Sequence, residues 1–168
     1  MDMSTHRYAG LAALLALTLA GCLQPPDYPV EPVLTFEGLS RDTMLQGFSD
    51  RDSIRVFLSF TDGDGDITPE AGSTVPNFYL ENLETGQVVN NFLTDPIPEE
   101  GVSNGISGEI SLRVFTTCCE YPNDIELPCT PSTRFPVDTL LLEAYLIDRA
   151  GNESNRVPLS PIYLLCDR

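Results

Sequence analysis

The chain has 168 residues, enough for one domain together with targeting material, and its formal net charge is −16 at pH 7. Such an acidic surface argues against nucleic-acid binding, which depends on cationic side chains that neutralise phosphates. There is no lysine, and the only histidine is His6, so beyond the N-terminal segment no Ser-His-Asp or Cys-His site can form, and we expect a protein that is not an enzyme.

The N-terminal segment has the pattern of an exported protein. A short polar head that contains His6 and Arg7 precedes the apolar run Ala9–Ala20. A membrane-spanning helix needs about 20 apolar residues, so this run is too short to span a bilayer. It predicts instead a secretory signal over residues 1–21.

The apolar run ends in Leu19-Ala20-Gly21-Cys22, which resembles the lipobox of bacterial lipoproteins at every position. The resemblance implies cleavage after Gly21 and covalent lipid on the Cys22 sulfur and the new N-terminus. Several acyl chains give stable anchoring, since each buried methylene contributes about 0.8 kcal/mol. An ordinary signal peptide with a chance cysteine is the alternative.

Leu23 follows the cysteine, and by the proteobacterial sorting rule this resembles outer-membrane cargo. We therefore expect a lipid-anchored protein of the outer membrane that faces the periplasm or the cell surface. Residues 22–32 form a Pro-rich segment with prolines at 25, 26, 29 and 32. Proline fixes φ and removes a hydrogen-bond donor, so this segment predicts an extended tether that spans roughly 30 Å.

Residues 33–168 show the hydrophobic alternation of β-strands and no helical period. Many short strands separated by loops rich in Gly, Pro, Asp and Asn predict an all-β fold, a single immunoglobulin-like antiparallel β-sandwich of about seven strands. A small barrel is the alternative. The Asn155–Cys166 strand carries Pro158 and Pro161, which favours a sheet edge. The predicted strands are Val33–Phe36, Ser53–Phe60, Asn77–Leu83, Gln87–Leu93, Ile106–Phe115, Thr139–Asp148 and Asn155–Cys166.

The chain has five cysteines, and once Cys22 carries lipid, Cys118, Cys119, Cys129 and Cys166 are left to form disulfides in an oxidising compartment. A zinc site is the alternative, but the spacing lacks the usual CxxC-like pairs. Because neighbours on a strand point to opposite faces, Cys118 and Cys119 should have different partners. We expect Cys119–Cys129 and Cys118–Cys166.

Two loops carry oxygen-bearing side chains directly after predicted strands. Asp62, Asp64 and Asp66 follow Ser53–Phe60, and Asp148 and Asn152 follow the strand that begins at Thr139. In an immunoglobulin-like sandwich these two strands are the second and the sixth, and they run in the same direction. We therefore expect the loops to meet and to form a Ca²⁺ site, since calcium takes six to eight oxygen ligands. Solvated turns rich in Asp and Gly are the alternative.

The turn Asp148-Arg149-Ala150-Gly151-Asn152 resembles the D-x-A-G-N turn of bacterial immunoglobulin-like and cadherin-like domains. Together, FTDGDGDI, CCEYPNDIELPCTPST and YLIDRAGNESN are similar to segments of uncharacterised surface lipoproteins of Bacteroidota-type bacteria. The acidic loop is not an EF-hand, because Ile67 and Ser73 stand where that loop needs its glycine and its glutamate.

These observations favour a non-catalytic, membrane-anchored lipoprotein of the cell envelope. Its calcium-stabilised sandwich would serve adhesion, envelope assembly or support of a protein partner. The alternative is a glycan-binding surface lipoprotein that assists carbohydrate uptake, for which Tyr79, Tyr121, Phe92 and Phe135 would form a sugar-stacking platform. Glycoside hydrolysis would need two carboxylates across a cleft, and the short loops do not provide that arrangement.

Overall fold

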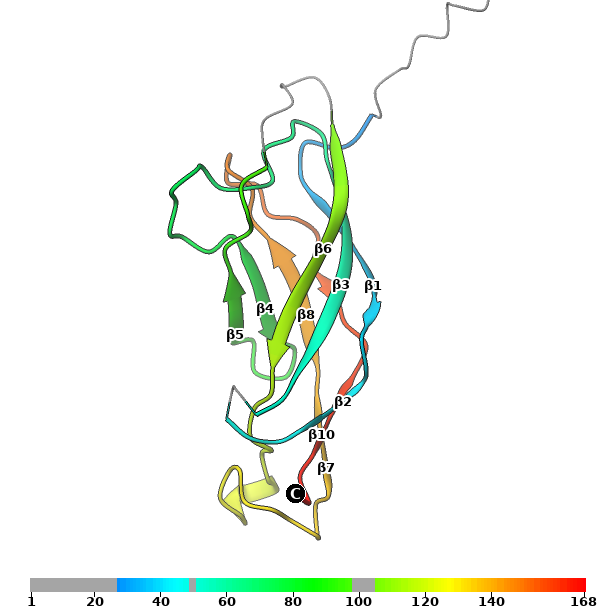
Figure 1. Cartoon of the computed structure of the whole chain (residues 1–168), viewed down its shortest axis with the longest axis vertical. Coiled ribbons are helices and arrows are strands. Elements are labelled where there is room, and N and C mark those ends of the chain that lie inside the picture. The colour runs from blue at the N-terminus through cyan, green and yellow to red at the C-terminus, as the bar shows by residue number, and fades with distance from the viewer. Residues whose placement is uncertain (1–26, 49–50, 98–104) are drawn as a thin grey trace, which may run out of the picture.

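The computed structural model describes residues 27–48, 51–97 and 105–168 (Figure 1). The predicted signal segment, Cys22 and the first part of the Pro-rich segment lie outside these residues. In the part of the chain that is described, no helix is both long enough and apolar enough to cross a membrane. The fold there is all-β, as the alternation predicted.

The described residues form ten strands and one turn of 3₁₀ helix, Pro122–Asp124. The strands are β1 (Val33–Leu39), β2 (Thr43–Leu45), β3 (Ser53–Asp62), β4 (Phe78–Asn82), β5 (Val88–Phe92), β6 (Ile106–Phe115), β7 (Val137–Leu140), β8 (Leu142–Leu146), β9 (Val157–Pro158) and β10 (Ile162–Leu165).

Two sheets pack face to face and enclose one hydrophobic core (Figure 1). One sheet has the order β1-β3-β6 and the other the order β5-β4-β8-β9, with antiparallel neighbours throughout. A smaller sheet, β2-β10-β7, continues the sandwich at one end, and in it β2 runs parallel to β10. These orders confirm the predicted all-β sandwich.

The longest strands follow directly from the sequence pattern. β3 places Ile54, Val56 and Leu58 on its buried face, and each of them is at most 1 % exposed. β6 pairs with β3 along its whole length, and it has the predicted limits, Ile106 to Phe115. Burial of an aliphatic side chain of this size stabilises the fold by about 1.5–3 kcal/mol. These two strands therefore fix the sheet whose end carries the acidic loop.

Two predicted strands are each divided in two and one strand was not predicted, which explains why ten strands are found where about seven were expected. Thr139–Asp148 is not one strand, because the chain leaves the β2-β10-β7 sheet after Leu140 and enters the larger sheet at Leu142. Asn155–Cys166 is likewise divided around Pro161 into β9 and β10. β9 is an edge strand, but β10 lies between β2 and β7, contrary to the prediction. The short strand β2 was not predicted.

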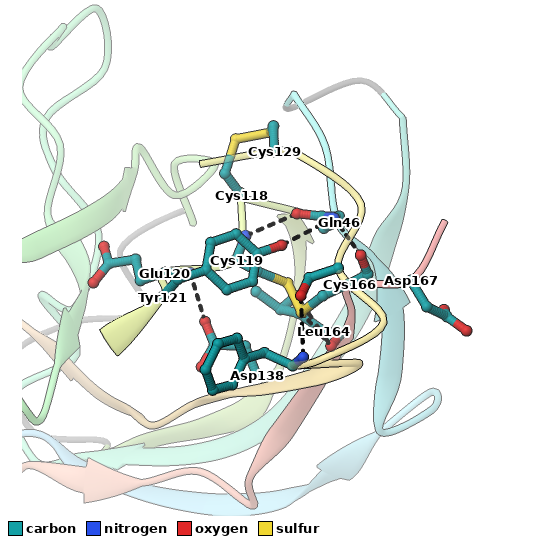
Figure 2. Close-up of a disulfide and its surroundings, with 12 residues drawn as sticks. Gln46, Cys118, Cys119, Glu120, Tyr121, Cys129, Asp138, Leu164, Cys166 and Asp167 are labelled. Carbon is teal, nitrogen blue, oxygen red and sulfur yellow. Dashed lines mark hydrogen bonds between the residues drawn. A yellow bond between two sulfur atoms is a disulfide. The ribbon is translucent and has the colours of Figure 1, made fainter. Parts of the chain in front are cut away.

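The four cysteines form two disulfides, but the predicted pairing is wrong. Cys118 bonds Cys129, and Cys119 bonds Cys166. The neighbours do take different partners, as expected, and it is Cys119 that points into the core, where it and Cys166 are 0 % exposed. The side chain of Gln46 fixes this arrangement, because it accepts a hydrogen bond from the Cys119 amide at 3.2 Å and donates one to the Cys166 carbonyl at 2.7 Å (Figure 2).

Candidate metal centre

The acidic loop begins where β3 ends. Asp62 is the last residue of that strand, and Asp64 and Asp66 follow it, separated by glycines. Gly65 has φ = 76°, a left-handed conformation that favours glycine. The chain can therefore turn tightly enough to bring side chains from alternate positions towards one point. One ligand atom from each of the three aspartates lies within 4.8 Å of the others.

Asp62 is the most unusual residue of this group. It is 0 % exposed, and neither of its carboxylate oxygens has a hydrogen-bond partner. One oxygen each of Asp64 and Asp66 is also buried without a partner. Buried polar groups are almost always hydrogen-bonded, and an isolated buried carboxylate is strongly unfavourable. The arrangement is one that a cation would satisfy.

The electrostatics of the loop lead to the same conclusion. Burial, and after it the neighbouring charges of Asp64 and Asp66, raise the pKa of Asp62 to about 6. The backbone amide of Asp66 opposes this rise, and the charge of Asp148 adds to it. The pKa of Asp66 is raised as well, by burial first and then by Asp148 and Asp64. Without a cation these carboxylates therefore repel one another at neutral pH.

The second predicted loop meets the first, as expected. β3 and β8 end at the same end of the sandwich (Figure 1). The Arg149 amide donates to the Asp66 carbonyl oxygen at 3.1 Å, and the Ala150 amide donates to Asp66 Oδ2 at 3.0 Å. Asp148, only 6 % exposed, lies close enough to affect the pKa values of Asp62 and Asp66.

The five predicted metal ligands take two different positions. Asp62, Asp64 and Asp66 form the compact group. Asp148 accepts hydrogen bonds from Asn152, at Oδ1 from the backbone amide at 2.7 Å and at Oδ2 from the side-chain amide at 2.8 Å. These bonds close the D-x-A-G-N turn. Asp148 lies outside the group of ligand atoms within 4.8 Å of one another, and the Asn152 side-chain nitrogen is directed at Asp148.

The donor set selects the kind of cation. All the candidate ligands are oxygens, which suit the hard ions Ca²⁺ and Mg²⁺, whereas zinc prefers nitrogen and sulfur. Mg²⁺ demands near-ideal octahedral geometry and keeps several waters, while Ca²⁺ accepts irregular sites with many carboxylate and carbonyl ligands. The three close carboxylates therefore provide oxygen ligands of the kind that Ca²⁺ accepts in irregular sites.

One contact beside this candidate centre was not predicted from the sequence. Tyr28 and Pro29, in the segment predicted to be a free tether, lie against Gly63 of the acidic loop. The ring of Tyr28 also lies over Gly105, just before β6. The available signal was the pair of glycines, but glycines are common in turns and do not identify what packs against them.

The predicted sugar-stacking platform does not form. Tyr121 is buried and its ring lies 6.1 Å from that of Phe135, while Phe92 packs edge-on against Phe78. Tyr79 borders an open pocket of about 640 Å³, lined also by residues 69–73, 75–77 and 147–149, and Tyr121 borders a different pocket. Asp148, one of the predicted metal ligands, is among the residues that line the pocket beside Tyr79.

Comparison with known proteins gave no match to a protein-family model, to a curated protein or to a solved structure. The chemistry of this centre therefore has to be inferred from the residues of this chain.

Proposed function

We propose that this chain is a non-catalytic, membrane-anchored lipoprotein of the cell envelope whose β-sandwich is stabilised by Ca²⁺. The ion would bind between the acidic loop after β3 and the turn after β8. The observation that carries this proposal is Asp62, a fully buried carboxylate whose two oxygens have no partner. Such a group is tolerated in a folded protein when a cation neutralises it.

Calcium would stabilise the domain by joining two chain segments. Asp66 already accepts two backbone hydrogen bonds from the second loop, from Arg149 and Ala150. A divalent ion would offset the repulsion among the carboxylates and make separation of the loops more costly. Extracellular calcium sites usually have dissociation constants of about 10⁻⁴–10⁻³ M, so the protein would bind calcium outside the cytoplasm without being a sensitive switch.

The placement of the two ends supports a display role at the outer membrane. The first described residues, which follow the predicted lipid anchor at Cys22, lie at one end of the long axis. The disulfide-bonded loop after β6 lies at the other end (Figure 1). An anchored domain of this shape would present its rigid, disulfide-bonded end to a partner in adhesion or envelope assembly.

Two experiments test the proposal. Membrane fractionation should find the protein with the outer membrane, and Cys22→Ser should remove it from the outer-membrane fraction. Titration calorimetry should detect one Ca²⁺ bound per chain. Asp64→Ala should abolish the heat, whereas Asp42→Asn, at an exposed acidic residue elsewhere on the domain, should not. No calcium heat in the wild type, or a Cys22→Ser protein that still sediments with the outer membrane, would overturn the corresponding half of the proposal.

Glycan binding is the second candidate, favoured by the position of Tyr79 in the pocket that adjoins the metal centre. Its ring stacks on Tyr145 at 5.1 Å, and its hydroxyl donates to the Pro76 carbonyl at 2.7 Å. One ring face and the hydroxyl are therefore already engaged, which leaves little of the side chain for a sugar. Affinity electrophoresis in gels that contain soluble glycans would decide, since retardation lost in Tyr79→Ala would establish this function.

A further inference from the structure

The Pro-rich segment before β1 does not stand free of the domain. A Cβ atom built on Gly63 would overlap the carbonyl oxygen of Tyr28 and would lie only 2.6 Å from the carbonyl oxygen of Pro29. Real Cβ atoms do not approach backbone that closely, so only glycine allows this contact. The tether backbone thus lies directly on the acidic loop at Gly63, the residue that separates Asp62 from Asp64 in the sequence.

A second glycine completes this docking site. A Cβ atom on Gly105 would lie 2.7 Å from the ring of Tyr28 and 3.1 Å from the Asp62 carbonyl oxygen. Tyr28 is half-buried as a result. Gly63 and Gly105 lie side by side at one end of the β3–β6 pair, next to its last paired residues, Asp62 and Ile106. We call the two glycines the glycine cradle.

The chain just beyond the cradle is held by other contacts. Pro32 is buried, and the side chain of Asn155 forms two hydrogen bonds with the backbone of Leu34. It accepts from the Leu34 amide at 2.7 Å and donates to the Leu34 carbonyl at 3.0 Å. The start of β1 is therefore fixed whether or not the acidic loop keeps its shape. Only the part of the tether up to residue 31 depends on the cradle.

We infer that calcium binding and docking of the tether are coupled, so that the ion sets how far the domain reaches from its lipid anchor. This inference rests on the proposed function. Gly63 lies between two of the carboxylates that the ion would hold together. If the ion leaves, the carboxylates separate, Gly63 moves with them, and the surface that receives Tyr28 and Pro29 is lost.

The consequence for the anchored protein is geometric. An extended chain covers at most about 3.5 Å per residue. With the tether docked at Tyr28, the domain can lie at most about 20 Å from the anchor at Cys22, and with the tether released up to Pro32 it can lie at most about 35 Å away. Calcium would thus hold the domain close to the membrane and in a restricted orientation.

The test uses the chain that begins at Cys22, with its thiol unacylated and carrying a nitroxide label, and the other cysteines in their disulfides. The electron paramagnetic resonance spectrum should show slow label motion in 10 mM CaCl₂ and faster motion in EDTA. Equal mobility in the two conditions, in a protein for which calorimetry detects bound calcium, would overturn the inference and leave the proposed function intact. If calorimetry detects no calcium, the proposed function itself fails.

A variant of the tether tests the same coupling in the other direction. Coupling between two binding events is reciprocal, so Tyr28→Ala should free the label in calcium and also weaken calcium binding, by about fivefold or more. The matched control is Tyr163→Ala, which removes a partly exposed tyrosine from β10 and should change neither measurement. A Tyr28→Ala protein with unchanged calcium affinity and unchanged label motion would show that the contact carries no coupling.

Discussion

Replacement of Asp62 by asparagine should stabilise the metal-free protein, and calcium should offset most of that advantage by stabilising the wild type alone. In the metal-free protein the buried carboxylate has its pKa raised from 3.8 to about 6. The folded state therefore binds a proton more tightly than the unfolded state, and the stability of the metal-free protein falls as pH rises from about 4 to about 6. At pH 7.5 the full penalty applies, on the order of 3 kcal/mol at 1.36 kcal/mol per unit.

Asp62→Asn removes that penalty while it keeps the size of the side chain. In EDTA at pH 7.5 the free energy of unfolding of the variant should exceed that of the wild type by up to about 3 kcal/mol. The variant should therefore unfold at a higher urea concentration. Near pH 4 the gain should nearly vanish, because the wild-type carboxyl is then protonated in the folded state. In 10 mM calcium the advantage of the variant should shrink by about 1.4–2.7 kcal/mol, since only the wild type gains the ion. A variant that is less stable than the wild type in EDTA at pH 7.5 would refute this reasoning.

Three further predictions concern the contacts around the site and the core. Substitution of Cys119 and Cys166 by serine removes a disulfide that spans 47 residues and should lower the free energy of unfolding by about 4 kcal/mol. Loss of the Cys118–Cys129 disulfide, which spans 11 residues, should lower it by about 3 kcal/mol. Urea unfolding of the two double variants measures the difference, and the reverse order would contradict the assignment. Asn155→Ala should cost about 1–3 kcal/mol equally in calcium and in EDTA, because its two hydrogen bonds to the start of β1 are independent of the ion. In wild-type protein kept in EDTA, the melting temperature should fall between pH 4 and pH 6 and change little above that range, and a rise with pH would contradict the raised pKa of Asp62.

Where burial alternates strictly, the sequence predicts the structure well. In β3 and β6 every second residue faces the core, and for this reason their positions could be read from the pattern. The change of sheet between Leu140 and Leu142 could not, since apolar residues continue through it and periodicity does not reveal which strand lies alongside. For the same reason the central position of β10 was not predicted, because Pro161 just before it favoured a sheet edge.

The meeting of the two loops at the candidate metal centre was predictable for a topological reason. Loops that follow two strands running in the same direction emerge at the same end of a sandwich, so Asp66 and the turn after β8 could be expected to meet. The pairing of Cys119 with Cys166 depends on the buried side chain of Gln46, which is far from both in sequence. Docking of Tyr28 depends on two glycines in separate loops. Neither contact leaves a local pattern.

Thermal melting of the chain from Cys22 onward, in 10 mM CaCl₂ and in EDTA at pH 7.5, tests calcium binding at the buried aspartates most directly. With a dissociation constant of about 10⁻⁴–10⁻³ M, the ion should add about 1.4–2.7 kcal/mol and raise the melting temperature by several degrees. Asp64→Ala should abolish the rise, and Asp42→Asn should keep it. Identical melting curves in calcium and EDTA would contradict the account, and the acidic loop would then be a turn without an ion.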